Sequence, residues 1–256
     1  MKISIIGSGW LAQPLAGQLI KNGHEVMMTS TRAEKVARLT QNGLDIRHYQ
    51  LGDELSADDQ LLDVDLLIIA ITSKDIDAYQ KLIKQVKSDQ TQAIIYISST
   101  SVYANSDEPH DENSPRLNFD NPLLDIEQVI QSHPQATIIR FAGLVGPKRH
   151  PGRFFAGGKT ITNPQARVNL IHLDDCLGII LAIINNQAWG EVFNGCADNH
   201  PAKGDFYPAM TAQLGAEPPL LDNKKGETSD KTILNHKVKN SLNYVLQQPD
   251  VFKFSY

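Results

Sequence analysis

The chain is poor in cysteine: it carries only Cys176 and Cys196, and these do not form a Cys-x-x-Cys motif. This scarcity argues against a disulfide framework and against a structural zinc site, and it favours a reducing cytosol. We therefore expect a cytoplasmic protein with no metal site.

Long apolar runs are also missing. The longest, "LLIIAI" and "IILAII", are far too short to span a bilayer, and we expect no membrane partner. The first residues, "MKISIIGSG", pass directly into a short apolar run and glycines, so we expect no signal peptide. A net charge of −5 lacks the basic excess that a general nucleic-acid-binding face requires. A small molecule is the expected partner, and the oligomeric state is left open.

Short apolar runs alternate with amphipathic stretches over the first 140 residues or so. The expected strands are 2–6, 25–29, 45–51, 64–72, 93–99 and 136–144, and the expected helices are 10–23, 32–43, 75–88 and 122–132. Such alternation predicts parallel βαβ units with right-handed crossovers. The fold class is thus α/β, a Rossmann-type doubly wound parallel sheet.

The pattern changes after Gly146. The stretch "GPKRHPGRFFAGGK" is rich in glycine, proline and basic residues and predicts a loop, and "DNKKGETSD" at 222–230 predicts a polar loop. Strands are expected at 168–173 and 190–195 and helices at 174–186 and 201–215; residues 229–246 predict a helix or a strand plus helix. We expect a Rossmann domain over 1–146, to which 168–195 returns, and a small C-terminal substrate lobe over 147–256.

A glycine turn follows the first strand. "IIGSGWLA" places Gly7, Gly9 and Ala12 in a G-x-G-x-x-A pattern that opens a helix. Gly7 allows a tight turn, Gly9 lets the backbone approach a pyrophosphate, and Ala12 allows close packing of helix and strand. The helix N-terminus offers free N–H groups to phosphate. The alternative is a tight turn without a ligand.

The end of the second strand predicts which cofactor binds. Folds that bind NAD usually place a carboxylate there to hold the ribose 2′-hydroxyl. This chain instead has Ser30, Thr31 and Arg32, so nothing repels a 2′-phosphate and a guanidinium is present to bind it. NADP is therefore expected, with NAD as the alternative. Arg32 could also be a solvated residue of the next helix, although a cation there opposes the helix dipole.

With these motifs placed, the chain resembles the extended or atypical branch of the short-chain dehydrogenase/reductase (SDR) superfamily. "SSTSVY", "RFAGLVGP", "VNLIHLDD" and "EVFNGCADNHP" match the family's segments in order, and the loop after Gly146 is similar to a bacterial NAD-dependent epimerase/dehydratase-like subgroup. The resemblance implies an oxidoreductase or isomerase of epimerase type. The implied cofactor-binding residues are Gly7, Ser8, Gly9, Trp10, Leu11, Ser30, Thr31, Arg32, Ala70, Ile71, Thr72 and Ser98.

Catalytic members of the family carry a Tyr-x-x-x-Lys pair after the "SSTSVY" strand. Here no tyrosine has a lysine four residues later, and no lysine occurs between Lys87 and Lys148. Alignment through Glu127 puts Phe119 and Leu123 at the two positions. Leu123 also belongs to an apolar stripe with Ile126 and Ile130. The pair is lost as a unit, so the family's standard mechanism is not expected.

The remaining candidates are polar groups near the expected cleft. The resemblance makes Ser99 the carbonyl-polarising residue, with Tyr103 and His150 as candidate acid/base groups. Ser99 could instead cap a turn, Tyr103 is more readily a packing residue, and His172 with Asp174 is more readily a structural pair. Lys148, Arg149 and Arg153 suit a phosphate or carboxylate, as in a phosphorylated substrate or a nucleotide sugar, or they form a solvated loop. A non-catalytic NADP(H)-binding sensor is the rival hypothesis.

Overall fold

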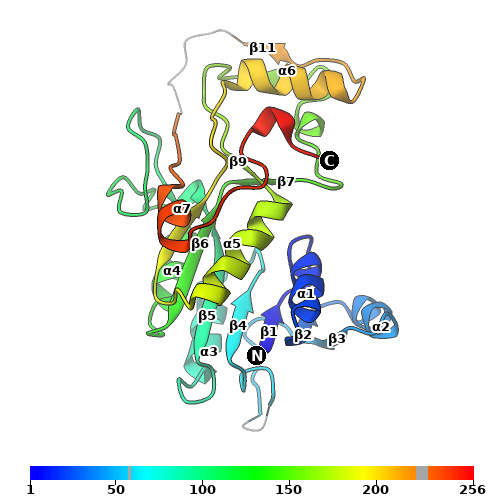
Figure 1. The fold of residues 1–256 in the computed structure, drawn as a ribbon, viewed down its shortest axis with the longest axis vertical. Coiled ribbons are helices and arrows are strands. Elements are labelled where there is room, and N and C mark those ends of the chain that lie inside the picture. Colours follow the sequence, from blue (N-terminus) through cyan, green and yellow to red (C-terminus); the bar gives the residue numbers. More distant parts are fainter. Residues whose placement is uncertain (57–58, 223–229) are drawn as a thin grey trace. The chain divides into compact units, whose positions relative to one another are not determined.

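The computed structural model describes residues 1–56, 59–222 and 230–256. Strands and helices alternate as expected (Figure 1). They are β1 (Lys2–Ile6), α1 (Ala12–Lys21), β2 (Glu25–Ser30), α2 (Ala33–Gln41), β3 (Asp45–His48), β4 (Leu66–Ile69), α3 (Ile76–Gln85), β5 (Ala93–Ser99), α4 (Pro122–Ile130), β6 (Ala136–Phe141) and β10 (Val192–Gly195). Most of the polar loop expected at 222–230 lies outside the described residues.

The remaining elements lie within the "SSTSVY" segment or follow β6 in the chain. They are the 3-10 turns η1 (Thr100–Val102), η2 (Pro151–Phe154) and η3 (Val251–Lys253), the strands β7 (Gly143–Val145), β8 (Thr160–Ile161), β9 (Leu170–His172) and β11 (Leu220–Leu221), and the helices α5 (Leu173–Asn186), α6 (Lys203–Gln213) and α7 (His236–Leu242). Within the described residues, no helix has the length and apolar character needed to cross a bilayer.

Local sequence signals begin and end the helices. Both α1 and α2 stop at an Asn-Gly pair, and Gly23 and Gly43 have φ of +81° and +79°, which glycine adopts without strain. Asp75 caps α3 by accepting a hydrogen bond from the backbone N–H of Ala78 at 3.0 Å. Asn121 caps α4 in the same way, ahead of a proline at the first helical position.

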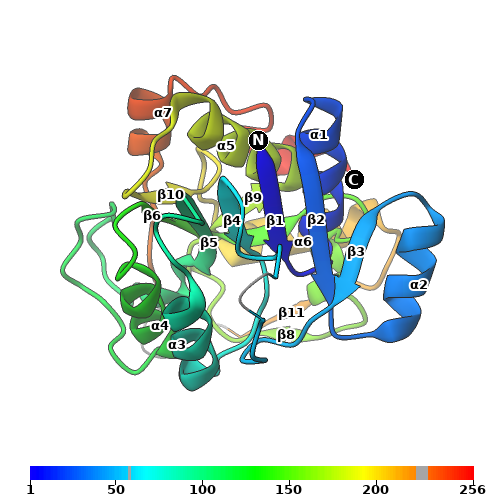
Figure 2. The same cartoon turned by 90° about the horizontal axis from the view of Figure 1, so that it is seen from below.

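Seven of these strands form one sheet with the order β10-β6-β5-β4-β1-β2-β3 (Figure 2), and β8 with β11 and β7 with β9 form two small sheets. β1 pairs in parallel with both β2 and β4, β2 with β3, and β4 with β5. Chain order reverses between β1 and β4, so this is the doubly wound arrangement that the sequence predicted. In such sheets, ligands bind outside the carboxyl ends of the strands at the point of reversal.

Several strands are shorter than expected. The run expected as one strand at 136–144 is divided into β6 and β7, which belong to different sheets. Two further differences bear on the site. β4 ends at Ile69 rather than at residue 72, and β3 ends at His48 rather than at residue 51. The residues that follow leave the sheet and line a cavity at the point of reversal. The sequence alone could not separate these residues from the strands before them, because each segment continues its strand without a glycine or proline.

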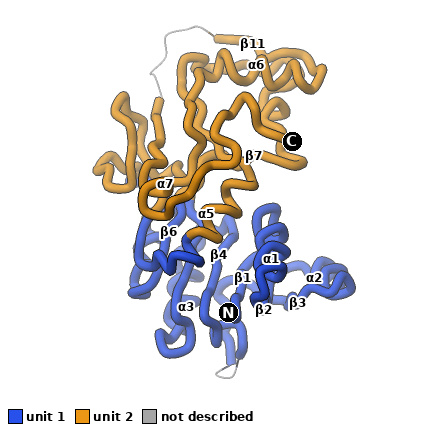
Figure 3. The backbone as a smooth tube through the Cα atoms, viewed as in Figure 1, with its two compact units in different colours: residues 1–98, 119–139, 183–192 blue, residues 99–118, 140–182, 193–256 orange. Residues whose placement is uncertain are grey.

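The chain divides into two compact units (Figure 3). Unit 1 comprises residues 1–98, 119–139 and 183–192, and unit 2 comprises 99–118, 140–182 and 193–256. Both units are therefore assembled from segments that alternate along the chain. The division expected at Gly146 and the return of 168–195 to the first domain stay predictions.

Each unit has its own apolar core. In unit 1, Leu67, Ile69, Ile94 and Tyr96 point to the same side of the sheet, as alternate residues of a strand do, and pack against α3 and α4. In unit 2, Val145, Val168 and Leu170 pack with Phe206 and Met210 of α6 and with Val251 and Phe254 of the C-terminal segment. The C-terminal residues are thus part of the unit 2 core.

Candidate functional site: a dinucleotide cavity and a strand-end turn

A cavity of about 660 Å³ lies in unit 1 at the carboxyl ends of the strands where the sheet order reverses. Its lining comes from the turn after β1, the end of β2 with the start of α2, and the segments after β3 and β4. The lining residues are Ile6, Gly7, Ser8, Gly9, Thr29, Ser30, Thr31, Arg32, Lys35, Tyr49, Gln50, Leu51, Ala70, Ile71, Thr72, Ser73, Asp75 and Ala78. The glycine turn therefore opens onto a real space.

The first glycine of this turn is required by the backbone itself. Gly7 has φ of +121°, and its N–H donates to the Thr29 hydroxyl at 3.1 Å. A Cβ atom at this position would lie 2.6 Å from the Ala70 carbonyl oxygen. Any side chain would therefore force the ends of β1 and β4 apart, whether or not a ligand is bound.

The second glycine is required for a different reason. A Cβ atom at Gly9 would have no atom within 4 Å, and its backbone φ is not in the left-handed region. The protein alone therefore leaves room for a side chain at Gly9, and that room faces the cavity. This is the space a pyrophosphate needs to approach the turn, so the residues present fit a dinucleotide.

Cations border the cavity at the end of β2. Arg32 precedes α2, is exposed, and its backbone N–H donates to the Ser30 hydroxyl at 3.2 Å. One turn later, the Lys35 ammonium donates to the carbonyl oxygen of Ser8. Burial, together with the charges of Arg32 and Arg38, lowers the pKa of Lys35. Arg32 thus lines the cavity from the N-cap position of α2, and Lys35 connects α2 to the glycine turn.

Most cofactor residues implied by the family resemblance lie at this cavity, but not all. Gly7, Ser8, Gly9, Ser30, Thr31, Arg32, Ala70, Ile71 and Thr72 line it, whereas Trp10, Leu11 and Ser98 do not. Leu11 is buried, and the Ser98 hydroxyl donates to the buried carboxylate of Glu127 at 2.5 Å. A cofactor contact for these three residues stays a prediction.

Sequence reasoning missed Lys35 and the segment Tyr49–Leu51. Lys35 could have been found because it lies three residues after Arg32, on the same face of the expected helix. Tyr49 and its neighbours could have been found because the ends of parallel strands share one edge of a sheet. Predicting β3 through residue 51 concealed that position.

The strand end that carries Ser99 belongs to unit 2. The Ser99 hydroxyl accepts a hydrogen bond from the backbone N–H of Ser101 at 3.1 Å and so caps η1. Of the two roles considered for Ser99, the capping role is therefore present in the structure. A role in polarising a substrate carbonyl stays a prediction.

Tyr103 is enclosed in a buried polar network. Its hydroxyl donates to Asn194 Oδ1 at 2.8 Å and accepts from Arg140 Nη1 at 2.9 Å. Only 1% of the side chain is exposed, and burial raises the pKa of Tyr103 although Arg140 opposes the shift. This environment supports the packing role, because an acid/base group needs access to substrate.

His150 is also engaged at both ring nitrogens. Nδ1 accepts from the Gly152 N–H at 3.1 Å, and Nε2 lies 3.3 Å from Gln213 Oε1, which assigns the proton to Nε2. The ring packs on Tyr256 with centroids 4.1 Å apart. Burial lowers the pKa of His150, so the neutral form is favoured. The side chains of Lys148, Arg149 and Arg153 in the same loop are exposed.

The pair formed by His172 and Asp174 has structural partners. His172 Nε2 lies 2.7 Å from the Ser255 carbonyl oxygen, and Nδ1 accepts from the Asp174 N–H at 3.2 Å. His172 is 1% exposed and holds the C-terminal segment against unit 2. This agrees with a structural role for the pair.

Phe119 and Leu123, which the sequence comparison aligned with the family's tyrosine and lysine, differ in exposure. Phe119 is 79% exposed, whereas Leu123 is partly buried against the core of α3 and α4. Ile126 and Ile130 are fully buried, so the apolar stripe predicted for this helix is confirmed. Leu123 therefore contributes to packing.

Comparisons with known proteins agree with this geometry. Residues 7–171 match a family model described as NAD(P)H-binding. Protein YeeZ of Escherichia coli strain K12 is 35% identical over 266 residues, which cover 97% of this chain and 97% of that protein.

Solved structures share the fold. One is a short-chain dehydrogenase/reductase superfamily protein from Agrobacterium tumefaciens with bound NAD; it has a TM-score of 0.77 and 16% identity, and the match covers 96% of this chain and 93% of that chain. Another is MoeE5 in complex with UDP-glucose and NAD, with a TM-score of 0.78 and 16% identity, covering 99% and 96% of the two chains. At such identities the likeness establishes the fold alone.

Proposed function

Because this chain belongs to the NAD(P)H-binding short-chain dehydrogenase/reductase superfamily, we propose that it is an NADP(H)-preferring oxidoreductase or epimerase-like enzyme with a non-standard acid/base group. The observation that carries the cofactor preference is the edge of the cavity at the end of β2. Hydroxyls and the cations Arg32 and Lys35 line it where a carboxylate would select the ribose of NAD. A 2′-phosphate placed there gains charge-assisted hydrogen bonds.

Different residues of the chain would hold the cofactor and the substrate. The glycine turn and the first turn of α1 hold the pyrophosphate, and Gly7 keeps the strand ends close enough to do so. Ser99 donates its hydroxyl hydrogen to the substrate oxygen, while its own oxygen stays fixed by the Ser101 N–H. A bound nicotinamide cofactor supplies the oxidation or reduction of a substrate carbon.

The acid/base group is sought outside α4, because Phe119 and Leu123 have no ionisable atom. His150 is one candidate: burial favours its neutral form, which can accept a proton once Nδ1 is released from the Gly152 N–H. A bound water is the alternative. Tyr103 is the weakest candidate because its hydroxyl has two partners and burial raises its pKa. The substrate is a small molecule with an anionic group. A nucleotide sugar such as the one in the MoeE5 complex is one member of that class.

We also propose a cytosolic location. Cys176 and Cys196 are both fully buried and unpaired, as expected of thiols in a reducing compartment.

Isotope exchange tests the enzyme proposal. Exchange between NADPH and labelled NADP⁺ is measured with a library of phosphorylated metabolites and nucleotide sugars. We expect exchange that depends on one metabolite class and that falls about 100-fold in Ser99→Ala, the scale of one donor lost from a developing oxyanion. Ser101→Ala, a neighbouring exposed hydroxyl, is the matched control. A turnover that is unaffected by Ser99→Ala, His150→Ala and Tyr103→Phe would place the site elsewhere.

A second candidate function is an NADP(H)-binding sensor without chemistry. Specific observations favour it: Leu123 is partly buried against the core, and Ser99 already serves as a turn cap. Tight NADPH binding without exchange for any library member would support the sensor.

A further inference from the structure

Lys231, far along the chain from β5, contacts the turn that follows this strand. The Lys231 ammonium donates to the carbonyl oxygens of Tyr103 at 2.9 Å and Thr100 at 3.2 Å. These carbonyls bracket η1, the turn that Ser99 caps. Unit 2 therefore brings a positive charge to the strand end after β5, although the sequence of α4 contains no lysine.

The backbone around Lys231 is held on both sides. Asn169 accepts from the Ile233 N–H at 3.0 Å and donates to the Lys231 carbonyl at 2.8 Å. His110 exchanges backbone hydrogen bonds with Thr232 and Leu234, at 2.8 and 2.9 Å. Because the backbone is fixed on two sides, the lysine stem has a defined origin and its ammonium is not a freely moving surface charge.

A second lysine lies close to the first. Lys203 begins α6, and its N–H donates to the Ala166 carbonyl at 2.9 Å. The preceding residue, Ala202, forms an antiparallel bridge with Arg167. The Arg167 N–H in turn donates to Asp230 Oδ1 at 2.7 Å, next to Lys231. The fold thus gathers both lysines around one short bridge.

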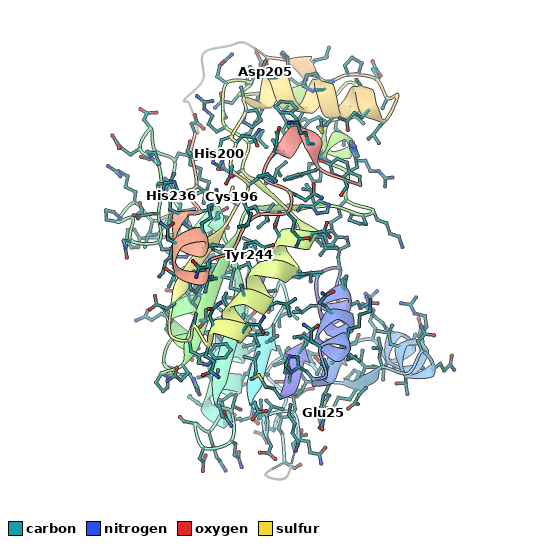
Figure 4. The ribbon with its side chains drawn as sticks, in the orientation of Figure 1. Glu25, Cys196, His200, Asp205, His236 and Tyr244 are labelled. Atoms are coloured by element: carbon teal, nitrogen blue, oxygen red, sulfur yellow. The ribbon has the colours of Figure 1, made fainter. Side chains whose placement is uncertain are left out.

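The nearby carboxylates do not neutralise this pair. Asp230 Oδ1 accepts from the backbone N–H groups of Arg167 and Lys231, and Oδ2 lies 4.0 Å from Arg167 Nε. Asp205, in the first turn of α6, is exposed (Figure 4). Within residues 1–56, 59–222 and 230–256, neither Lys203 nor Lys231 forms an ion pair with a carboxylate.

Burial and the charge of Lys203 both affect the pKa of Lys231. Burial lowers the pKa of its ammonium, and the charge of Lys203 lowers it further. Two like charges held close together cost free energy, which an anion placed between them would recover. A doubly charged phosphoryl group matches the two positive charges.

We propose that Lys203 and Lys231 form a phosphoryl-binding subsite in unit 2, separate from the exposed basic loop at Lys148–Arg153. Its use as a substrate subsite rests on the proposed enzyme function, but its existence does not. The subsite would hold the phosphoryl end of a substrate beside the turn that carries Ser99. It would also give the enzyme a lysine charge at β5 without the lysine of the family's helix.

Competitive acetylation of the whole, folded chain tests the subsite. Isotope-coded acetic anhydride reports the reactive neutral fraction of each lysine by peptide mass spectrometry, in inorganic phosphate and in sodium chloride of equal ionic strength. We expect phosphate to slow labelling of Lys203 and Lys231 about threefold, as a rise in pKa of about 0.5 implies. Lys84, exposed in unit 1, and Lys239, paired with Asp198, serve as controls and should not change.

The variants decide whether the two lysines act together. Lys203→Gln should abolish the protection of Lys231, while Lys239→Gln should leave it intact. Equal labelling in phosphate and chloride for the wild type would overturn the subsite, and so would protection of Lys231 that persists in Lys203→Gln. Failure to bind NADPH would instead contradict the proposed function and would leave the acetylation result to decide the subsite by itself.

Discussion

The turn after β1 and the turn after β5 both follow a buried parallel strand, yet one is open and the other is filled. At Gly9 a side chain would meet nothing within 4 Å, and the space belongs to a cavity. At Ser99 and Tyr103 the polar groups already have protein partners. The first turn has unused binding capacity, whereas the second uses much of its capacity for structure. Ligand binding is therefore better supported in unit 1 than chemistry is in unit 2.

Substitutions at the two glycines should separate binding from folding by the largest margin. Gly9→Val should abolish NADPH and NADH binding, because the side chain occupies the pyrophosphate space, while the free energy of unfolding changes by less than about 1 kcal/mol. Gly7→Val should instead destabilise the fold by about 3 kcal/mol or more, through strain and a backbone clash. Calorimetric titration and denaturant unfolding measure the two effects. Wild-type affinity in folded Gly9→Val would refute the dinucleotide cavity.

Arg32 should set the choice between cofactors. Arg32→Ala should weaken NADPH binding by about 1–3 kcal/mol, the range for a hydrogen bond to a charged group, and leave NADH nearly unchanged. Arg38→Ala, on the same helix but outside the cavity lining, is the control. Equal losses for both cofactors would rule out a 2′-phosphate contact.

A substitution in the turn after β5 should change the free energy of unfolding and leave cofactor binding unchanged. Tyr103→Phe leaves Arg140 Nη1 and Asn194 Oδ1 without their bond to the hydroxyl, which should cost about 1–3 kcal/mol of unfolding free energy. NADPH affinity should stay at the wild-type value. A stable Tyr103→Phe protein would mean that the network is less important than its geometry suggests.

Restoring the family's pair should not restore its chemistry. Leu123→Lys should destabilise the protein by about 1–2 kcal/mol, because Leu123 packs against the apolar core. Phe119→Tyr should be nearly neutral, since the ring is exposed and an untuned tyrosine has a pKa near ~10. Thermal unfolding and the exchange assay test both, and a gain of activity in Phe119→Tyr alone would contradict this expectation.

Both units should lose a little stability in acid through buried histidines. Burial lowers the pKa of His133 in unit 1 and of His110 in unit 2, so the folded state favours the neutral ring. Stability is then full above the unfolded-state pKa of about 6.5 and falls as the pH drops below it, with a slope of at most about 1.4 kcal/mol per pH unit for each histidine. The loss is complete once the pH lies below the folded-state pKa. His133→Gln should reduce the slope of unfolding free energy between pH 7 and pH 5. An unchanged slope would show that His133 has the same pKa in the folded and unfolded states.

The fold and the cofactor turn were predictable because they depend on local, periodic signals. Alternating apolar runs, Asn-Gly stops and the G-x-G-x-x-A spacing act over a few residues, and each was found where expected. The sequence also shows that no tyrosine has a lysine four residues later, while the loss of the family's catalytic pair stays a prediction.

The tertiary structure decided which side chains remain available. The sequence by itself determined the order of strands and helices along the chain and the position of the glycine turn. It could not show that Tyr103 is enclosed by Arg140 and Asn194, or that Lys231 lies on the turn after β5. These contacts join residues that are 37 to 131 positions apart. Local periodicity carries no information over such separations, because pairing of distant segments is set by the packing of the whole chain.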